Sequence, residues 1–401
     1  MTVSSAAKAG SGGGPGAPSP ASRAVSAVDS SDSGAPSDIS AWQCGPNPFE
    51  LVRPDIEPLS CSIKELLRTD HAVLNMAAQH FFDRQTGKQF RPTIVLLMAR
   101  AAGRVADTAA AAATSAAPAL ANVPGVSSAV GSEAISDAAD DPFVKQFRLA
   151  EITEMIHTAS LIHDDVLDEA DTRRGGAAVH KAYSNTVAVL AGDYLLARAS
   201  LMLARLRHIH VVETMALSLE SLVQGEIMQI KATPEERMQM SLYIEKSFYK
   251  TASLIAYSCK SAALLGGHAL DSAVTTAAYD YGYHLGLAFQ IVDDMLDFTG
   301  SADALGKPKL QDMALGLATA PILFAAEEHP ELERLIKRKF EERGDLDRAY
   351  ELLLNSDGLG KTSALAECHA RKAVEALRVL PNSASKDALI HLCYIVLSRN
   401  K

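Results

Sequence analysis

The sequence has few aromatic residues, no surplus of basic residues and no long apolar run. Only 5% of its 401 residues are aromatic, whereas 48% are hydrophobic, so a large core can form but must be mainly aliphatic. The formal net charge of -10 argues against non-specific nucleic-acid binding, which needs a basic surface. We therefore expect no nucleic-acid partner, and an anionic substrate would need local cations.

Cysteine is also scarce, and its pattern excludes the usual cysteine-based sites. The five cysteines are odd in number and show no CxxC or Cys/His ligand spacing, which favours free thiols in a reducing compartment: Cys44, Cys61, Cys259, Cys368 and Cys393. No uninterrupted apolar run reaches the length of about 18 residues typical of a membrane-spanning helix. No apolar core of a secretory signal is present either, so we predict no transmembrane segment.

The first part of the chain differs in composition from the rest. Residues 1–45 are rich in Ser, Ala, Gly and Pro and have almost no large apolar side chains, which predicts a disordered extension. It carries Lys8 and Arg23 and no acidic residue before Asp29, a weak transit-peptide character. A mitochondrial location is the prediction, with the cytoplasm as the alternative.

Residues 46–401 are predicted to form one all-α domain. From 143 to 299 proline is nearly absent and apolar residues recur at helical offsets, as in Ile152, Met155, Ile156, Ala159 and Ile162. A second biased stretch, about 103–141, is dominated by Ala and Ser. It is interpreted either as a surface insertion between two helices or as an Ala-rich helix.

Two acidic clusters share the spacing DDxxD. The first and last acids of such a cluster lie one turn apart on one helix face, with the second acid beside them. Because carboxylates so close repel one another, a divalent cation is expected between them, and hard oxygen ligands suit Mg²⁺. One cluster alone is more typical of a solvated acidic face. Two clusters that both follow apolar helix favour a metal site: Asp164, Asp165, Asp168, Asp293, Asp294 and Asp297.

Cations accompany these clusters. Arg173 and Arg174 follow the first cluster in a turn-prone segment, and guanidinium groups match phosphate oxygens bidentately. Each cation alone would be more typical of an ordinary surface charge. Their association with paired acids favours a site for a phosphorylated substrate, to which further cations and a hydroxyl contribute: Lys88, Arg91, Lys250, Thr251 and Lys307.

Together these motifs resemble the trans-isoprenyl diphosphate synthase family, over roughly residues 48–401. The motifs are 87–92, 151–175 with the first DDxxD, Lys250-Thr251, and Phe289-Gln290 before the second DDxxD. Within the family the chain is similar to the long-chain polyprenyl (solanesyl or decaprenyl) diphosphate synthases that make ubiquinone side chains. The resemblance implies one helical bundle around a central cavity, about three Mg²⁺ ions per site and a homodimer. The implied reaction is successive condensation of isopentenyl diphosphate onto an allylic diphosphate.

The resemblance also assigns roles to individual residues. It places the diphosphate of isopentenyl diphosphate at Lys88, Arg91, His157 and Arg174, and the allylic diphosphate at Arg173, Lys250, Thr251, Gln290 and Lys307. Its catalytic set is Asp164, Asp168, Arg173, Lys250 and Asp293. By itself a histidine such as His157 is more typical of a helical core, although its spacing puts it on nearly the same helix face as Asp164.

Small residues precede the first acidic cluster. Ser160 lies one turn before Asp164 on nearly the same face, and the resemblance places Ala159 beside it in the floor of the channel for the growing chain. Short-chain relatives carry bulky aromatic residues there, so a long product is expected. The alternative is that small residues only permit close helix packing.

Two other functions are weighed against this one. A class I terpene cyclase shares the fold and the first DDxxD, but it typically replaces the second cluster with an Asn/Ser/Glu-type motif and needs no second diphosphate site. A non-catalytic subunit of a heteromeric prenyl synthase usually loses the acidic clusters. Because both clusters are complete here, a catalytic chain is favoured, whether as a homodimer or as a heteromer with a second subunit.

Overall fold

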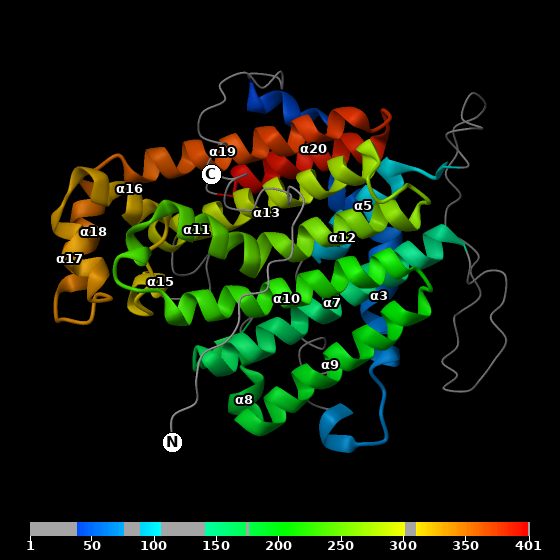
Figure 1. The fold of residues 1–401 in the computed structure, drawn as a ribbon, viewed down its shortest axis with the longest axis horizontal. Coiled ribbons are helices and arrows are strands. Elements are labelled where there is room, and N and C mark those ends of the chain that lie inside the picture. Colours follow the sequence, from blue (N-terminus) through cyan, green and yellow to red (C-terminus); the bar gives the residue numbers. More distant parts are fainter. Residues whose placement is uncertain (1–37, 76–88, 106–140, 174–175, 301–309, 400–401) are drawn as a thin grey trace, which may run out of the picture.

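The chain folds into a bundle of packed helices (Figure 1). The computed structural model describes residues 38–75, 89–105, 141–173, 176–300 and 310–399. Its first half contains η1 Ile39–Cys44, α2 Pro48–Leu51, α3 Arg53–Leu66, α5 Phe90–Ala102, α7 Pro142–Leu167, α8 Val179–Ala182, α9 Asn185–Arg205 and α10 Ile209–Lys231. Its second half contains η3 Glu236–Met238, α11 Met240–Ser247, η4 Phe248–Ala252, α12 Ser253–Leu265, α13 Ala273–Thr299, α15 Gln311–Ala314, α16 Ala320–Glu328, α17 Glu331–Lys337, α18 Asp345–Leu354, α19 Gly358–Ala376, η5 Leu377–Val379 and α20 Ala384–Leu397.

The all-α prediction is confirmed. Within the described residues the strands are limited to β1 Thr172–Arg173 and β2 Gly176–Ala177, which pair antiparallel as one short ladder. The ladder follows the first acidic cluster, where the sequence predicts a turn-prone segment. It holds Arg173 in a fixed extended backbone beside that cluster.

Two long helices, α7 and α13, form the centre of the bundle and carry the two acidic clusters. α13 packs against α12 and α19, while α7 packs against α5, α9 and α12. α7 begins at a strong start signal, since Asp141 accepts a hydrogen bond from the Phe143 amide (2.8 Å) and Pro142 is the first helical residue. At α13 the Ser272 hydroxyl caps the amide of Thr275. Each acidic cluster lies at the opposite, C-terminal end of its helix.

The end of the predicted disordered extension is helical instead, and its residues 1–37 lie outside the described part of the chain. Residues 39–44 form the helix η1, and Trp42 within it is buried. The Arg371 guanidinium lies over the Trp42 ring, 5.6 Å from its centroid, and η1 packs against α20. Composition did not reveal this packing, because one large aromatic residue changes the average hydrophobicity of a 45-residue segment very little. The predicted insertion falls between α5 and α7, and its residues 106–140 lie outside the described part of the chain.

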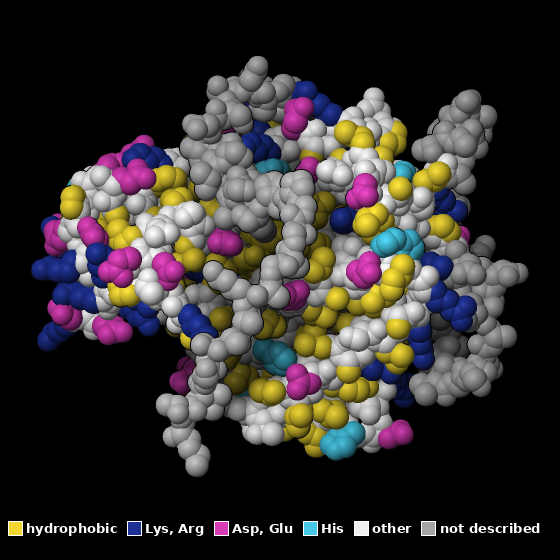
Figure 2. All heavy atoms as spheres, viewed as in Figure 1, with side chains coloured by type: hydrophobic (Ala, Val, Ile, Leu, Met, Phe, Trp, Pro, Cys, Tyr) yellow, Lys and Arg dark blue, Asp and Glu magenta, His cyan; other side chains and the backbone are white. Residues whose placement is uncertain are grey.

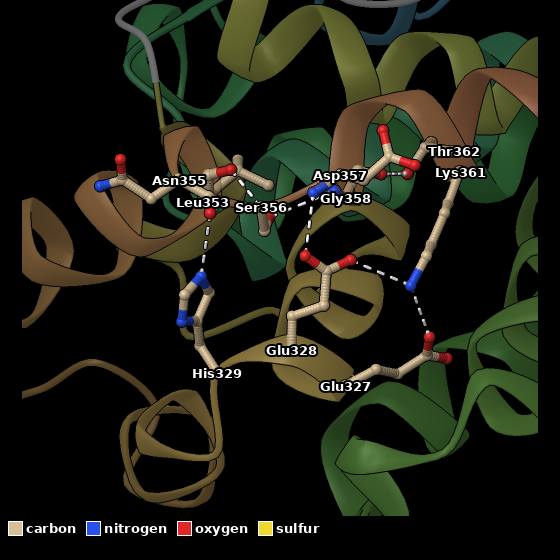
Figure 3. A network of polar contacts seen from close by, with 10 residues as sticks. All are labelled: Glu327, Glu328, His329, Leu353, Asn355, Ser356, Asp357, Gly358, Lys361 and Thr362. Atoms are coloured by element: carbon tan, nitrogen blue, oxygen red, sulfur yellow. Dashed lines mark hydrogen bonds and ion pairs between the residues drawn. The ribbon is translucent and has the colours of Figure 1, made fainter.

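A polar network fixes the C-terminal helices to one another (Figure 3). Lys361 of α19 bridges Glu327 (3.1 Å) and Glu328 (3.0 Å) at the end of α16, and Glu328 also accepts the amide of Asp357 (3.2 Å). His329 contacts the Asn355 carbonyl at the end of α18. The network therefore connects α16, α18 and α19. Thr319, the residue before α16, lines a cavity that is described below.

One helix among the described residues, α9, is long and apolar enough to span a membrane. Less than half of the most apolar stretch of α9 is buried. By length and composition it could cross a membrane, so the prediction of no transmembrane segment is not confirmed here. Because α9 packs along α7, a core helix with one uncovered apolar face gives the same signal.

Candidate active site

The two acidic clusters face one cavity of about 610 Å³. The first cluster contributes Asp168 to its wall, and the second contributes Asp293, Asp294 and Asp297. The same wall carries four of the other predicted residues: Arg173, Lys250, Thr251 and Gln290. The structure therefore brings together acids and cations that are more than a hundred residues apart in the sequence.

The first cluster combines one ion-paired acid with acids whose pKa is raised by burial. Asp165 is buried and forms an ion pair with Arg173, whose Nε donates at 2.8 Å. Burial raises the pKa of Asp164 to about 7, and Lys250 lowers it only in part, because Glu226 and Asp168 add negative charge nearby. The pKa of Asp168 is raised for the same reason. Negative charge is thus only partly compensated at this cluster.

Two acids of the second cluster accept hydrogen bonds from neighbouring protein groups. Asp294 accepts hydrogen bonds from the Tyr243 hydroxyl (2.6 Å) and the Gln290 amide (2.7 Å). Its burial and the nearby Asp312 raise its pKa to about 8. Asp297 accepts the backbone amides of residues 311 and 312 at 3.1 and 3.2 Å. This second cluster therefore shapes the turn into α15 as well as the cavity.

Lys250 and Thr251 lie in a distorted turn. Residues 248–252 adopt a π-helix between α11 and α12, a feature often found at functional sites. The Lys250 ammonium pairs with Glu226 and also donates to the Gln229 side chain (3.3 Å). Thr251 donates to the Gln290 side-chain oxygen (2.6 Å). The π-helix thus contacts α10 through Lys250 and α13 through Thr251, and both side chains line the cavity.

Arg91 and His157 meet away from this cavity wall. The Arg91 guanidinium at the start of α5 lies 2.8 Å from His157 Nε2 on α7. Because a guanidinium can only donate, His157 accepts at Nε2 and its proton is on Nδ1. The structure therefore pairs two residues that the resemblance assigns to one diphosphate. Three other predicted residues lie outside the described part of the chain: Lys88, Arg174 and Lys307.

The two predicted chain-length residues lie on α7 before the first cluster. Ala159 is completely buried, and the Ser160 hydroxyl donates back to the His157 carbonyl (2.9 Å). Neither residue lines the 610 Å³ cavity. Their role in product length therefore stays a prediction.

Several residues of the site were not predicted from the sequence. Arg399, near the C-terminus, contacts Asp293 at 2.6 Å and lies over the Phe289 ring, 4.7 Å from its centroid. No local sequence pattern predicts the contact between Arg399 and Asp293, because these residues are 106 positions apart in the chain. Lys246 could have been found from its place one turn before Lys250 on the same helix face. The others form contacts visible only in three dimensions: Glu226, Gln229, Tyr243 and Asp312.

The sequence matches the polyprenyl synthetase family over residues 71–353. This match covers most of the chain and contains both acidic clusters. The chain belongs to the polyprenyl synthetase family. It is a prenyltransferase, and the family resemblance predicted from its motifs is confirmed.

Relatives within the polyprenyl synthetase family are similar along most of their length. The chain is 46% identical to the probable mitochondrial hexaprenyl pyrophosphate synthase of Neurospora crassa, over 88% of this chain and 82% of the relative. It is 42% identical to the mitochondrial solanesyl-diphosphate synthase 1 of rice, over 88% and 79%. A crystal structure of a Caulobacter crescentus polyprenyl synthase, complexed with calcium and isoprenyl diphosphate, has a TM-score of 0.73 at 30% identity, over 88% and 97%.

The donor chemistry of this polyprenyl synthetase site fits a hard divalent cation. All six acids offer carboxylate oxygens, and the raised pKa values of Asp164 and Asp294 mark charge that the protein itself does not neutralise. Within the described residues, however, no three acidic, histidine or cysteine side chains converge closely enough to hold a metal ion. Arg173 and Arg399 pair with two of the acids instead. Binding of a cation would therefore have to replace these ion pairs.

Proposed function

We propose that the chain synthesises a long all-trans polyprenyl diphosphate of solanesyl or decaprenyl length for the ubiquinone side chain. It condenses isopentenyl diphosphate onto an allylic diphosphate, depends on Mg²⁺ and works in the mitochondrion. The observation that carries the proposal is that both DDxxD clusters face one cavity with Lys250, Thr251 and Gln290 in its wall. The names of the relatives, which include mitochondrial hexaprenyl and solanesyl synthases, support the product class and the compartment.

The hard step of this chemistry is the separation of a negative diphosphate from an allylic cation. Groups that bind the departing charge more strongly than the ground state lower the barrier. Lys250 and Arg173 supply such charge at the cavity wall, and Thr251 is oriented by its hydrogen bond to Gln290. Mg²⁺ held by the six acids would neutralise the diphosphate oxygens. The Arg91–His157 pair would hold the second substrate, with Lys88 and Arg174.

An incorporation assay tests this function. Purified protein with Mg²⁺, labelled isopentenyl diphosphate and farnesyl diphosphate is expected to form labelled prenyl product. Chelation of the metal with EDTA is expected to abolish incorporation, because the paired acids would repel the diphosphate. Readdition of Mg²⁺ is expected to restore it. Unchanged incorporation in EDTA would rule out a metal-dependent site.

A homodimer is part of the proposal, and an uncovered apolar surface on two neighbouring helices supports it. This surface, which we call the α9/α10 face, appears in the lower half of Figure 2. Large exposed apolar surfaces of this kind mark protein interfaces, and a two-fold dimer would cover the same face on both copies. Its members are Val189, Leu190, Leu201, Leu217, Val223, Ile227 and Ile230.

Charges placed in this face are expected to separate the dimer. The substitution pair Val223→Asp and Ile227→Asp would desolvate carboxylates in the interface, so light scattering after gel filtration should give the monomer mass. Leu354→Asp is the matched control, because Leu354 is similarly exposed on α18 (58%) but isolated from the face. A wild-type monomer, or an unchanged mass in the double variant, would contradict a dimer formed through this face. A complex active only with a different subunit would favour the heteromer.

A further inference from the structure

A second cavity of about 460 Å³ adjoins the active-site cavity. The two cavities share part of their walls, including Asp168, Gln229 and Lys246. We call the second one the side cavity. The two cavities therefore lie side by side.

Three cations from separate elements converge on the side cavity. Arg237 lies in η3, Lys246 in α11 and Lys339 in the turn after α17. No side-chain hydrogen bond or ion pair joins any of the three to another residue of the described chain. By contrast, Lys250 pairs with Glu226 and Lys337 with Glu333. Cations that converge without carboxylate partners are a feature of anion sites.

One of these cations, Lys339, lies in a segment with a strained backbone. Lys339 and the buried Phe340 adopt φ of 58° and 56°, a conformation costly for non-glycine residues. A Cβ added to Gly316 in the cavity wall would lie 2.9 Å from Lys339 Cβ. Glycine is thus required at 316 for the close approach of Lys339, and its own φ of 76° also favours glycine.

The rest of the side cavity is mixed in character. Asp168 and Glu169 add negative charge, while Leu167, Ile230 and Leu315 are apolar and exposed at its rim. Burial lowers the pKa of Lys246, and Asp294 opposes that shift. An anion that bound here would meet three cations and two acids, one of which also faces the active site.

We propose that the side cavity binds a diphosphate group beside the first acidic cluster, apart from the two substrate sites of the proposed function. The identity of the ligand rests on the proposed function. In each condensation the allylic C–O bond breaks, its electron pair leaves with the diphosphate, a new C–C bond forms and the product loses a proton. The inorganic diphosphate has to leave before the elongated diphosphate takes its place. The side cavity offers the adjoining cationic space.

Titration of metal-free protein with inorganic diphosphate tests the site. In EDTA the acidic clusters repel the ligand, so calorimetry reports the side cavity together with the proposed Arg91–His157 substrate site, and the substitution pair below separates the two. The substitution pair Arg237→Gln and Lys339→Gln is expected to weaken binding at least about 10-fold, since each charged hydrogen bond lost contributes appreciably. The control pair, Arg334→Gln and Lys337→Gln on α17, removes the same charge from outside the cavity and should leave binding unchanged.

The outcomes separate the proposal from the function itself. Equal loss in both pairs would show a general charge effect and overturn the proposal, as would absence of binding by the wild-type protein. A parallel titration with farnesyl diphosphate identifies the source: equal affinity assigns the site to released diphosphate, and much tighter binding assigns it to the incoming substrate. Incorporation of label by the wild-type protein is measured separately, so failure of this site leaves the proposed reaction standing.

Discussion

Replacement of Asp164 by asparagine is expected to lower kcat on the order of 10²- to 10³-fold without loss of the fold. Asparagine has nearly the same shape but cannot supply the negative oxygen that a divalent metal ion requires as a ligand. In the folded protein the carboxylate is partly buried beside Glu226 and Asp168, and its pKa is raised to about 7. Its ionised form therefore costs stability whenever no cation is bound.

The same variant is expected to be at least as stable as the wild-type protein in EDTA. A carboxyl whose folded pKa exceeds its unfolded value of 3.8 binds more protons when folded, so stability falls as pH rises between 3.8 and about 7. Asp164→Asn should remove this part of the pH dependence. Thermal melts at several pH values and single-turnover kinetics measure both effects.

The control for Asp164→Asn is Asp347→Asn. Asp347 is exposed in the first turn of α18 and lines neither cavity. Its replacement should leave kcat within about 2-fold, as is usual for surface positions. Full activity in Asp164→Asn would contradict a metal role for the first cluster. Loss of activity together with loss of the fold would instead point to a structural role.

Ala159→Tyr is expected to shorten the product by several isoprene units. The phenol ring would fill the channel below the first cluster, so the chain would end where the ring begins. Ala159 is completely buried on α7, and two interpretations predict different stabilities. If Ala159 faces a channel, the ring is accommodated; if it is packed against a helix, overpacking costs about 1–3 kcal/mol.

Chromatography of the dephosphorylated products, combined with thermal melts, separates these interpretations. Ala191→Tyr on α9 is a matched control, because Ala191 is also completely buried but was not assigned to the channel. Shorter products from a stable Ala159→Tyr variant support the channel. Unchanged product length from an active variant would refute it.

Much of the fold follows from local pattern. The period of apolar residues across 143–299 predicts the long helices, and the structure places α7 and α13 there. The predicted end of the disordered extension at residue 45 was wrong, because residues 39–44 form a helix that is stabilised by burial of the Trp42 ring. Burial against α20 and Arg371 is a long-range effect, and composition cannot reveal it.

The site was predictable to the extent that its residues share a helix. The spacing within each DDxxD cluster fixes a helix face, so convergence on one cavity could be anticipated. Contacts across the bundle could not, because nothing in the sequence near Asp293 indicates Arg399, and nothing near Asp294 indicates Tyr243. The π-helix that carries Lys250 packs against both α10 and α13, and the periodicity of a single sequence does not encode such contacts.

The length of the product is the most direct measure of the proposed function. Purified protein is incubated with Mg²⁺, labelled isopentenyl diphosphate and either farnesyl or geranylgeranyl diphosphate, and the dephosphorylated products are sized. We expect a ladder of all-trans chains that ends at solanesyl or decaprenyl length. A product that stops at a short chain, or a cyclised hydrocarbon, would contradict it.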